Sequence, residues 1–160
     1  MKPSMLQRAI DLAVAAHAGM EDPPGEPYIL HPMRVMGRFD DHELMAVAIL
    51  HDTIERAGVT AARLRAAGLP KRVIQAVERL THEKDTTYAD YVVALSTDDL
   101  ARQVKAADLL DNADLRYIDF PPAKPKKGTR RAVRYVLSYQ FLTGRLTEKT
   151  YRRLMKDAEN

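Results

Sequence analysis

The fold of this chain is decided by residues 44–55, LMAVAILHDTIE, where apolar side chains recur at helical spacing and then give way to His51, Asp52 and Glu55. Such spacing predicts an amphipathic helix whose apolar face is buried. The same face would carry titratable side chains towards the core at the C-terminal end of the helix. Because an unpaired buried charge is costly, a cation bound between these groups would stabilise them. We therefore interpret this stretch as part of a metal site.

Helical spacing extends from this stretch over nearly the whole sequence, and no alternating pattern of useful length predicts a strand. We expect an all-α fold, a single-domain helical bundle of about eight or nine helices whose boundaries are uncertain by a few residues. The domain would span residues 1–160, with the metal-site motifs within 16–118 and the C-terminal helices in 121–160. Pro32 suits the first turn of a helix, which would place His31 just outside it. A loop rich in proline and lysine is expected at residues 120–128.

The composition excludes several classes of protein. The chain has 160 residues and no cysteine, so it can form neither a disulfide nor a thiolate metal site. Its 25 basic and 22 acidic residues leave a net charge of +3, which is too small to argue for nucleic acid as a partner. No stretch approaches membrane-spanning length, and the N-terminus lacks a secretory apolar run. We expect a cytoplasmic protein with no membrane partner.

A second helix, over residues 101–115, places Lys105, Asp108 and Asn112 on its core-facing side. Together with His31 and the pair His51-Asp52, Asp108 completes a set of two imidazoles and two carboxylates. This mixed nitrogen and oxygen set suits Mn²⁺, Fe²⁺, Mg²⁺ or Zn²⁺, and it gives no reason to expect a closed structural zinc site. A coordinated water of lowered pKa would then be a nucleophile.

Four ordered motifs carry a resemblance to a known family: AHAG at 16–19, GEPYILHP at 25–32, HDTIE at 51–55 and KAADLLDN at 105–112. The chain resembles the HD superfamily of metal-dependent phosphohydrolases. Within it, the chain is similar to the hydrolase domain of the bifunctional (p)ppGpp synthetase/hydrolases and to the small alarmone hydrolases. The resemblance implies an HD-type helical bundle and a divalent metal ion, usually Mn²⁺.

The resemblance also implies roles for individual residues. The metal ligands would be His31, His51, Asp52 and Asp108. Glu55 would take the place of the acid that activates the water, one turn beyond the His-Asp pair, although it could equally be a residue at the helix end that pairs with Arg56. For contact with the substrate, we consider three residues: Asn112, Lys105 and Lys84.

Three departures from the family pattern concern the substrate. Arg56 stands where the alarmone hydrolases usually have a second acid, and Asp111 stands where a histidine usually precedes the asparagine. The loop before GEPY contains Glu21, Asp22 and two prolines, whereas the family loop is basic and grips the nucleotide. The metal site thus carries over better than the substrate pocket.

From these patterns we expect a hydrolase that cleaves a phosphate ester or pyrophosphate bond of a small phosphorylated nucleotide. (p)ppGpp, a 5′-nucleotide monophosphate and another nucleoside diphosphate derivative all stay open as substrates. The alternative is a module that binds metal and nucleotide with little or no turnover and acts through a partner. A third interpretation, nucleic-acid binding through the basic run Lys124–Arg134, has less support because such runs are usually solvated. The sequence leaves a homo-oligomer open.

Overall fold

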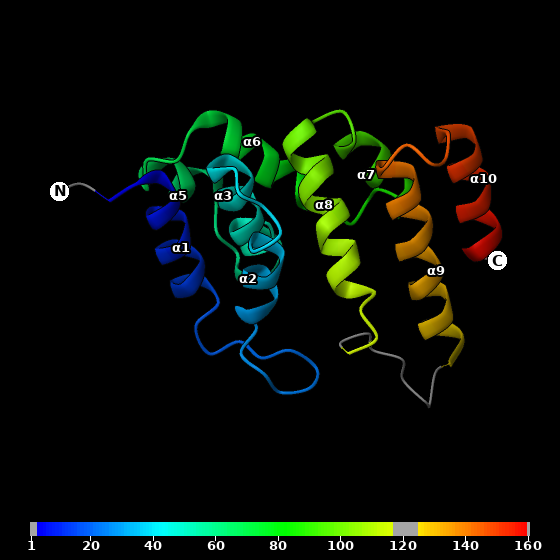
Figure 1. The fold of residues 1–160 in the computed structure, drawn as a ribbon, viewed down its shortest axis with the longest axis horizontal. Coiled ribbons are helices and arrows are strands. Elements are labelled where there is room, and N and C mark those ends of the chain that lie inside the picture. Colours follow the sequence, from blue (N-terminus) through cyan, green and yellow to red (C-terminus); the bar gives the residue numbers. More distant parts are fainter. Residues whose placement is uncertain (1–2, 117–124, 160) are drawn as a thin grey trace.

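The structure is a computed structural model that describes residues 3–116 and 125–159, and within these ranges it is built from helices (Figure 1). Apart from them, an isolated antiparallel bridge joins Glu21 to Pro27. The predicted all-α fold is confirmed. In chain order the described helices are α1 (Met5–Ala16), α2 (Leu30–Met36), α3 (His42–Leu50), α4 (Thr53–Ala57), α5 (Ala61–Ala66), α6 (Lys71–Leu80), α7 (Tyr88–Leu95), α8 (Asp99–Asn112), α9 (Pro125–Leu142) and α10 (Glu148–Glu159).

The core is organised around α3, whose residues 46–50 are fully buried. A helix that is apolar on all sides must be covered on all sides, and α3 packs against α1, α2, α6 and α8. The sequence pattern predicts an amphipathic helix here, with a single buried face. In the structure α3 is instead the central helix, because other helices surround it.

The predicted helix over residues 44–55 is two helices, with His51 and Asp52 in the turn between α3 and α4. Two side chains contact backbone carbonyl oxygens at the end of α3. His51 Nδ1 lies 2.8 Å from the Ala48 oxygen, and Thr53 Oγ1 donates to the Leu50 oxygen. The short α4 then ends at Gly58, whose φ of +65° suits a residue without a side chain. This break raises the number of described helices to ten.

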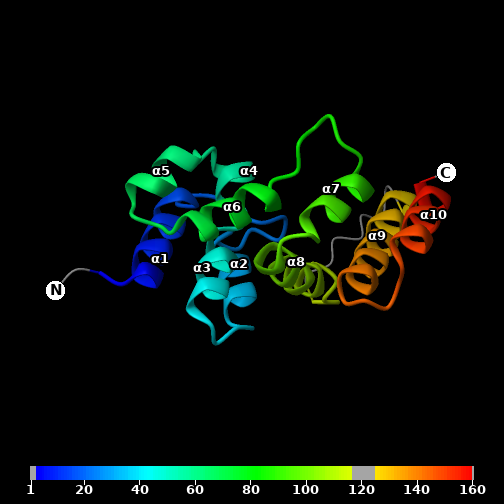
Figure 2. The ribbon, with the colours of Figure 1, turned by 90° about the horizontal axis from the view of Figure 1, so that it is seen from above.

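The C-terminal part of the chain continues the row of helices beyond α8, since α9 packs on α8 and α10 packs on α9 and α7 (Figures 1 and 2). Part of the predicted loop at residues 120–128 lies outside the described residues, and the rest of it is wrong, because α9 begins at Pro125. The basic run after Lys124 is therefore helical. Among the described residues, no helix is long and apolar enough to cross a bilayer.

Tyr151 fixes α10 against α9. The side chain is fully buried, its ring stacks on Phe141 at a centroid distance of 4.7 Å, and its hydroxyl lies 2.9 Å from Ser138 Oγ. The ring and the hydrogen bond therefore make separate contributions to stability.

We expect Tyr151→Phe, which removes only the hydroxyl, to lower the free energy of unfolding by about 1 kcal/mol. Tyr151→Ala, which also leaves a cavity, should lower it by about 3–5 kcal/mol. Urea unfolding followed by circular dichroism measures both. Equal losses in the two variants would show that the ring does not pack as described.

Candidate metal centre and substrate cavity

His31 lies in the first turn of α2, because the helix begins at Leu30, two residues earlier than the sequence predicts. The loop before it is closed by the Glu21–Pro27 bridge and by a hydrogen bond from the Tyr28 backbone nitrogen to the Met20 oxygen. These contacts fix the point at which α2 begins. His31 is thereby directed towards α8 and the turn that follows α3.

Asp108 lies on α8, and its helical neighbours contact it as their spacing predicts. Lys105 Nζ is 2.8 Å from Asp108 Oδ2, and the Asn112 side-chain amide donates to Asp108 Oδ1. All three side chains thus lie on the face of α8 that meets α2 and α3. Lys105 supplies the positive charge that a buried carboxylate needs, and it also lies 5.5 Å above the centre of the Tyr91 ring.

The four predicted ligands come together in the structure. His31 Nε2 lies 3.2 Å from His51 Nε2, 3.2 Å from Asp108 Oδ1 and 3.9 Å from Asp52 Oδ2. His51 Nε2 is 3.4 Å from Asp52 Oδ2 and 3.7 Å from Asp108 Oδ1. Three separate parts of the chain supply them, namely α2, the α3–α4 turn and α8. His31, His51 and Asp52 alone already form a group that could hold a metal ion.

The hydrogen bonds of the two imidazoles fit such an ion. His31 Nδ1 faces the Asp111 carboxylate at 2.8 Å, and His51 Nδ1 faces the Ala48 carbonyl at 2.8 Å. Since both partners accept hydrogen bonds, each Nδ1 carries a proton, and each ring in its neutral form would present the Nε2 lone pair. Two lone pairs facing each other at 3.2 Å repel, so a cation or a proton must lie between them.

The charges around His51 explain why its protonation is tied to the carboxylates. Burial by itself lowers the pKa of His51, but Asp52 and Asp108 outweigh it and raise the pKa to about 10. Burial also raises the pKa of Asp52 and Asp108, yet His51 and Lys105 respectively hold these two pKa values well below the usual range. The protein groups alone thus favour two carboxylates with positive charge between them, which is the charge pattern that a divalent ion also satisfies.

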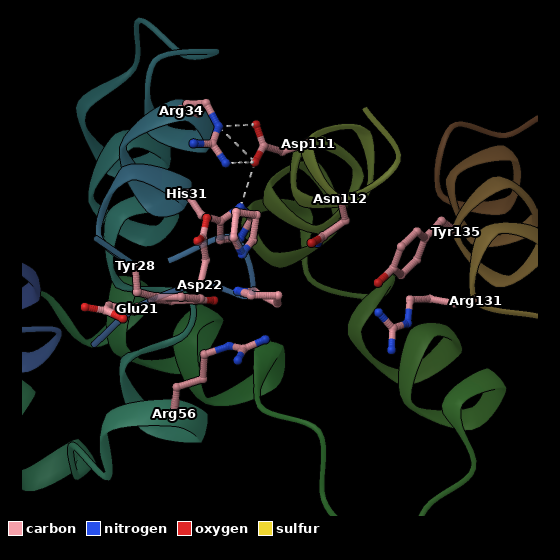
Figure 3. A pocket seen from close by; sticks show the side chains of 12 residues that line it. Glu21, Asp22, Tyr28, His31, Arg34, Arg56, Asp111, Asn112, Arg131 and Tyr135 are labelled. Carbon is pink, nitrogen blue, oxygen red and sulfur yellow. Dashed lines mark hydrogen bonds and ion pairs between the residues drawn. The ribbon is translucent and has the colours of Figure 1, made fainter. Parts of the chain in front are cut away.

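Asp111 and Arg34 form a buried support behind His31 (Figure 3). The guanidinium of Arg34 donates from Nε to Asp111 Oδ1 at 3.0 Å and from Nη2 to Asp111 Oδ2 at 2.9 Å. Burial alone would raise the Asp111 pKa, but hydrogen bonds from His31 and Arg34 lower it instead. A carboxylate that accepts from Nδ1 sets the tautomer and the orientation of a ligating histidine. Asp111 would therefore direct the His31 Nε2 lone pair at the cluster.

Asp52 is held from the other side by Tyr28 and Arg56. The Tyr28 hydroxyl donates to Asp52 Oδ2, and Arg56 Nε donates to the same oxygen at 3.1 Å. Arg56 also lies over the Tyr28 ring, with its guanidinium carbon 4.7 Å from the ring centre. The sequence suggested a pairing of Arg56 with Glu55, whereas the hydrogen bond that the structure records for Arg56 is to Asp52.

A cavity of about 370 Å³ opens next to the cluster. In Figure 3 its side chains come from the 21–28 loop, from α2, α4 and α8, and from α9 on the opposite side. The lining residues are Glu21, Asp22, Pro23, Pro24, Tyr28, His31, Arg34, Arg56, Asp111, Asn112, Arg131 and Tyr135. Glu21 and Asp22 thus stand on the loop and the arginines stand on the helices, while Asp111 of α8 is paired with Arg34.

No family model matches the sequence, but individual proteins do. The guanosine-3′,5′-bis(diphosphate) 3′-pyrophosphohydrolase of Aquifex aeolicus is 31% identical over 134 residues, which are 76% of this chain and 19% of that protein. The probable GTP pyrophosphokinase of Mycobacterium leprae is 29% identical over 141 residues, 81% of this chain and 17% of that protein. The chain therefore spans less than a fifth of the length of these relatives.

A solved structure supports the same relationship at the level of the fold. It is described as a metazoan ortholog of SpoT that hydrolyzes ppGpp, and it matches with a TM-score of 0.68 and 19% identity over 99% of this chain and 96% of that chain. The chain resembles an alarmone hydrolase domain. The resemblance that the sequence motifs predict is thereby confirmed, and so is the HD-type helical bundle.

For two other predicted residues, the structure records no hydrogen bond or ion pair with the four clustered groups among the described residues. Glu55 is exposed on α4, and its Oε2 accepts a hydrogen bond from the His82 backbone nitrogen at 3.1 Å. Lys84 is exposed in the loop between α6 and α7. Lys105 and Asn112, by contrast, both contact Asp108 directly. The roles of all four stay predictions.

Three residues that hold the predicted ligands were not singled out for this role from the sequence: Tyr28, Arg34 and Asp111. Each lies three positions from a predicted ligand, Tyr28 and Arg34 on either side of His31 and Asp111 after Asp108. Within a helix, a spacing of three places side chains on the same face, which applies to Arg34 on α2 and to Asp111 on α8 but not to Tyr28, which precedes α2. For Arg34 and Asp111 a local signal is therefore present, but it becomes specific only when the partner helix is known.

The Asp111 carboxylate gives a pH-dependent prediction for the metal-free protein. Its pKa is lower in the folded state, so its contribution is fully present above the unfolded pKa, near 4, and is lost as the pH falls further. At pH 6 we expect Asp111→Asn to lower the free energy of unfolding by about 1–3 kcal/mol.

The measurement is urea unfolding with EDTA present, at pH 6 and at pH 3.5, where the difference from the wild type should shrink. Asp114→Asn is the control, because Asp114 pairs with Arg116 at the surface and should have little effect. A difference for Asp111→Asn that is as large at pH 3.5 as at pH 6 would contradict the role of its charge.

Proposed function

We propose that this chain is a metal-dependent phosphohydrolase that cleaves a phosphate ester or pyrophosphate bond of a small nucleotide. One observation carries the proposal: two imidazole Nε2 atoms face each other at 3.2 Å between two carboxylates, beside a cavity that is large enough for part of a nucleotide. Hydrolysis by a metal-activated water requires such an open site with nitrogen and oxygen ligands.

His31, His51, Asp52 and Asp108 would hold the ion. Mn²⁺ is our first choice, and Fe²⁺, Mg²⁺ and Zn²⁺ suit the same set of side chains. When bound, a divalent ion here would lower the pKa of a water molecule and offset the negative charge of a phosphate. Lys105 balances the Asp108 carboxylate, which keeps it ionised for this role.

The other residues of the site would bind the substrate and accept the proton of the attacking water. Glu55 is our candidate for the group that accepts the proton of the attacking water. Asn112 lines the cavity while its amide donates to Asp108, so it lies where a substrate would meet the ligands. Tyr135 would stack on a base, and Arg131 would attract a phosphate. Lys84 would reach a phosphate from its exposed loop.

Guanosine-3′,5′-bis(diphosphate) is the first substrate to consider, because the Aquifex relative is named as its 3′-pyrophosphohydrolase. This chain departs from the alarmone hydrolases at the cavity, where Glu21 and Asp22 stand on the loop. A 5′-nucleotide monophosphate and other nucleoside diphosphate derivatives are therefore the next candidates. The second function to consider is a metal- and nucleotide-binding module, which the engagement of Glu55 with the His82 backbone would favour.

A hydrolysis screen tests the reaction. Purified protein with Mn²⁺ is incubated with (p)ppGpp, nucleoside diphosphates and 5′-nucleotide monophosphates, and released phosphate and pyrophosphate are measured. We expect turnover of at least one of these substrates, and we expect Asp52→Ala to lose it by a factor of about 10³ or more, because a transition-state interaction is removed. Activity that persists in metal-free Asp52→Ala protein would refute the mechanism. Nucleotide binding without product would favour the binding module.

Glu55→Gln separates a proton acceptor from a structural residue. The glutamine can still accept the hydrogen bond from the His82 nitrogen but cannot take a proton from water. We expect kcat to fall by about 10²–10⁴, with an unchanged melting temperature and an unchanged Mn²⁺ affinity. A variant that keeps full activity would show that Glu55 serves only to hold the loop.

A further inference from the structure

The Arg56 guanidinium lies in the cavity, and the protein occupies only part of its hydrogen-bonding capacity. Its Nε donates to Asp52 Oδ2 at 3.1 Å, and its face rests on the Tyr28 ring. Within the described part of the chain, the structure records no hydrogen bond from its two terminal nitrogens. The side chain is 52% exposed and lines the cavity. The guanidinium is thus fixed in place while its outer donors stay available to a ligand.

The other cavity arginine on this side of the cluster is committed to a protein partner. Arg34 donates from both Nε and Nη2 to the buried Asp111 carboxylate, so releasing it would leave that charge unpaired. Arg56 therefore differs from Arg34 in having donors to offer without breaking a buried ion pair. In Figure 3 it points into the cavity, with Arg131 of α9 on the opposite side.

The charges on the loop of the cavity favour one position for a bound anion. Glu21 and Asp22 stand on the loop, and a phosphate near them would be repelled. Asp22 also accepts a hydrogen bond from the Glu26 nitrogen, which keeps its carboxylate at the loop. The phosphate end of a substrate is therefore drawn to the side of Arg56, and the uncharged part of the substrate is left for the loop.

We propose that Arg56 is a phosphate-binding residue whose charge also weakens metal binding until a phosphate arrives. The proposal rests on the proposed function, since it takes Asp52 as a metal ligand. A cation held by Asp52 would lie close to the Arg56 guanidinium, which donates to the same carboxylate, and the two positive charges would repel each other. A phosphate that accepts from Arg56 offsets this repulsion, so metal and phosphate each tighten the binding of the other.

The sign of the change in metal affinity on removal of Arg56 distinguishes this role from a structural one. If Arg56 only oriented Asp52, its removal would loosen a ligand and weaken metal binding. If its charge opposes the metal, its removal strengthens metal binding while it weakens phosphate binding. A single substitution therefore has opposite effects on the two ligands.

The test uses the full chain, with calorimetric titration of Mn²⁺ alone and, separately, of inorganic pyrophosphate into EDTA-treated protein. We expect Arg56→Gln to bind Mn²⁺ about three- to tenfold more tightly than the wild type, because a repelling charge is gone. Its affinity for pyrophosphate should be about tenfold weaker, because charge-assisted hydrogen bonds are lost. Arg56→Lys, which keeps the charge, should bind Mn²⁺ as the wild type does.

Arg79→Gln is the matched control. Arg79 is 50% exposed and also pairs with an aspartate, Asp98, at 3.7 Å. Its replacement by glutamine changes the net charge of the protein by the same amount. It should leave both affinities unchanged, and circular dichroism checks the fold of every variant. The inference would be overturned if Arg56→Gln bound Mn²⁺ no more tightly than the wild type, or if it bound pyrophosphate as tightly as Arg79→Gln does. Either result would leave the proposed function standing. A wild-type protein that binds no Mn²⁺ would overturn the proposed function as well.

Discussion

The structure depends on the close approach of His31 and His51, whose Nε2 atoms lie 3.2 Å apart. Two neutral rings could not stay in this position with both Nδ1 atoms donating outward, so the contact requires positive charge between them. Asp52 and Asp108 supply the matching negative charge, and Lys105 balances the second of these. The packing of α2, α3 and α8 brings these charges together.

Each member of the cluster is held by a group behind it. Asp111 holds His31, the Ala48 carbonyl holds His51, Tyr28 holds Asp52, and Lys105 holds Asp108. Such supporting contacts restrict the rotamers of the clustered side chains before any ligand is present, which reduces the entropy that binding would otherwise cost. The precision of the site therefore comes from residues that never need to touch the ion.

The sequence was sufficient for the fold class and for the meeting of the four clustered side chains, because helical spacing and ordered motifs are local signals. It was insufficient where tertiary packing decides. The helix breaks at His51-Asp52, where the side chains of His51 and Thr53 bond to carbonyl groups at the end of α3, and α3 is enclosed on all sides because four helices pack on it. The contact of Asp111 with His31 joins residues 80 positions apart, so no local pattern could reveal it.

That separation has a consequence for the newly made chain. The cluster needs α2, the turn after α3 and α8, so its full set of side chains exists only after residues 31–112 have been synthesised and packed together. A site assembled from such distant segments forms late in folding, because long loops must close first. Metal binding through all four side chains would then require α8 to be in place, whereas His31, His51 and Asp52 come together earlier in the sequence.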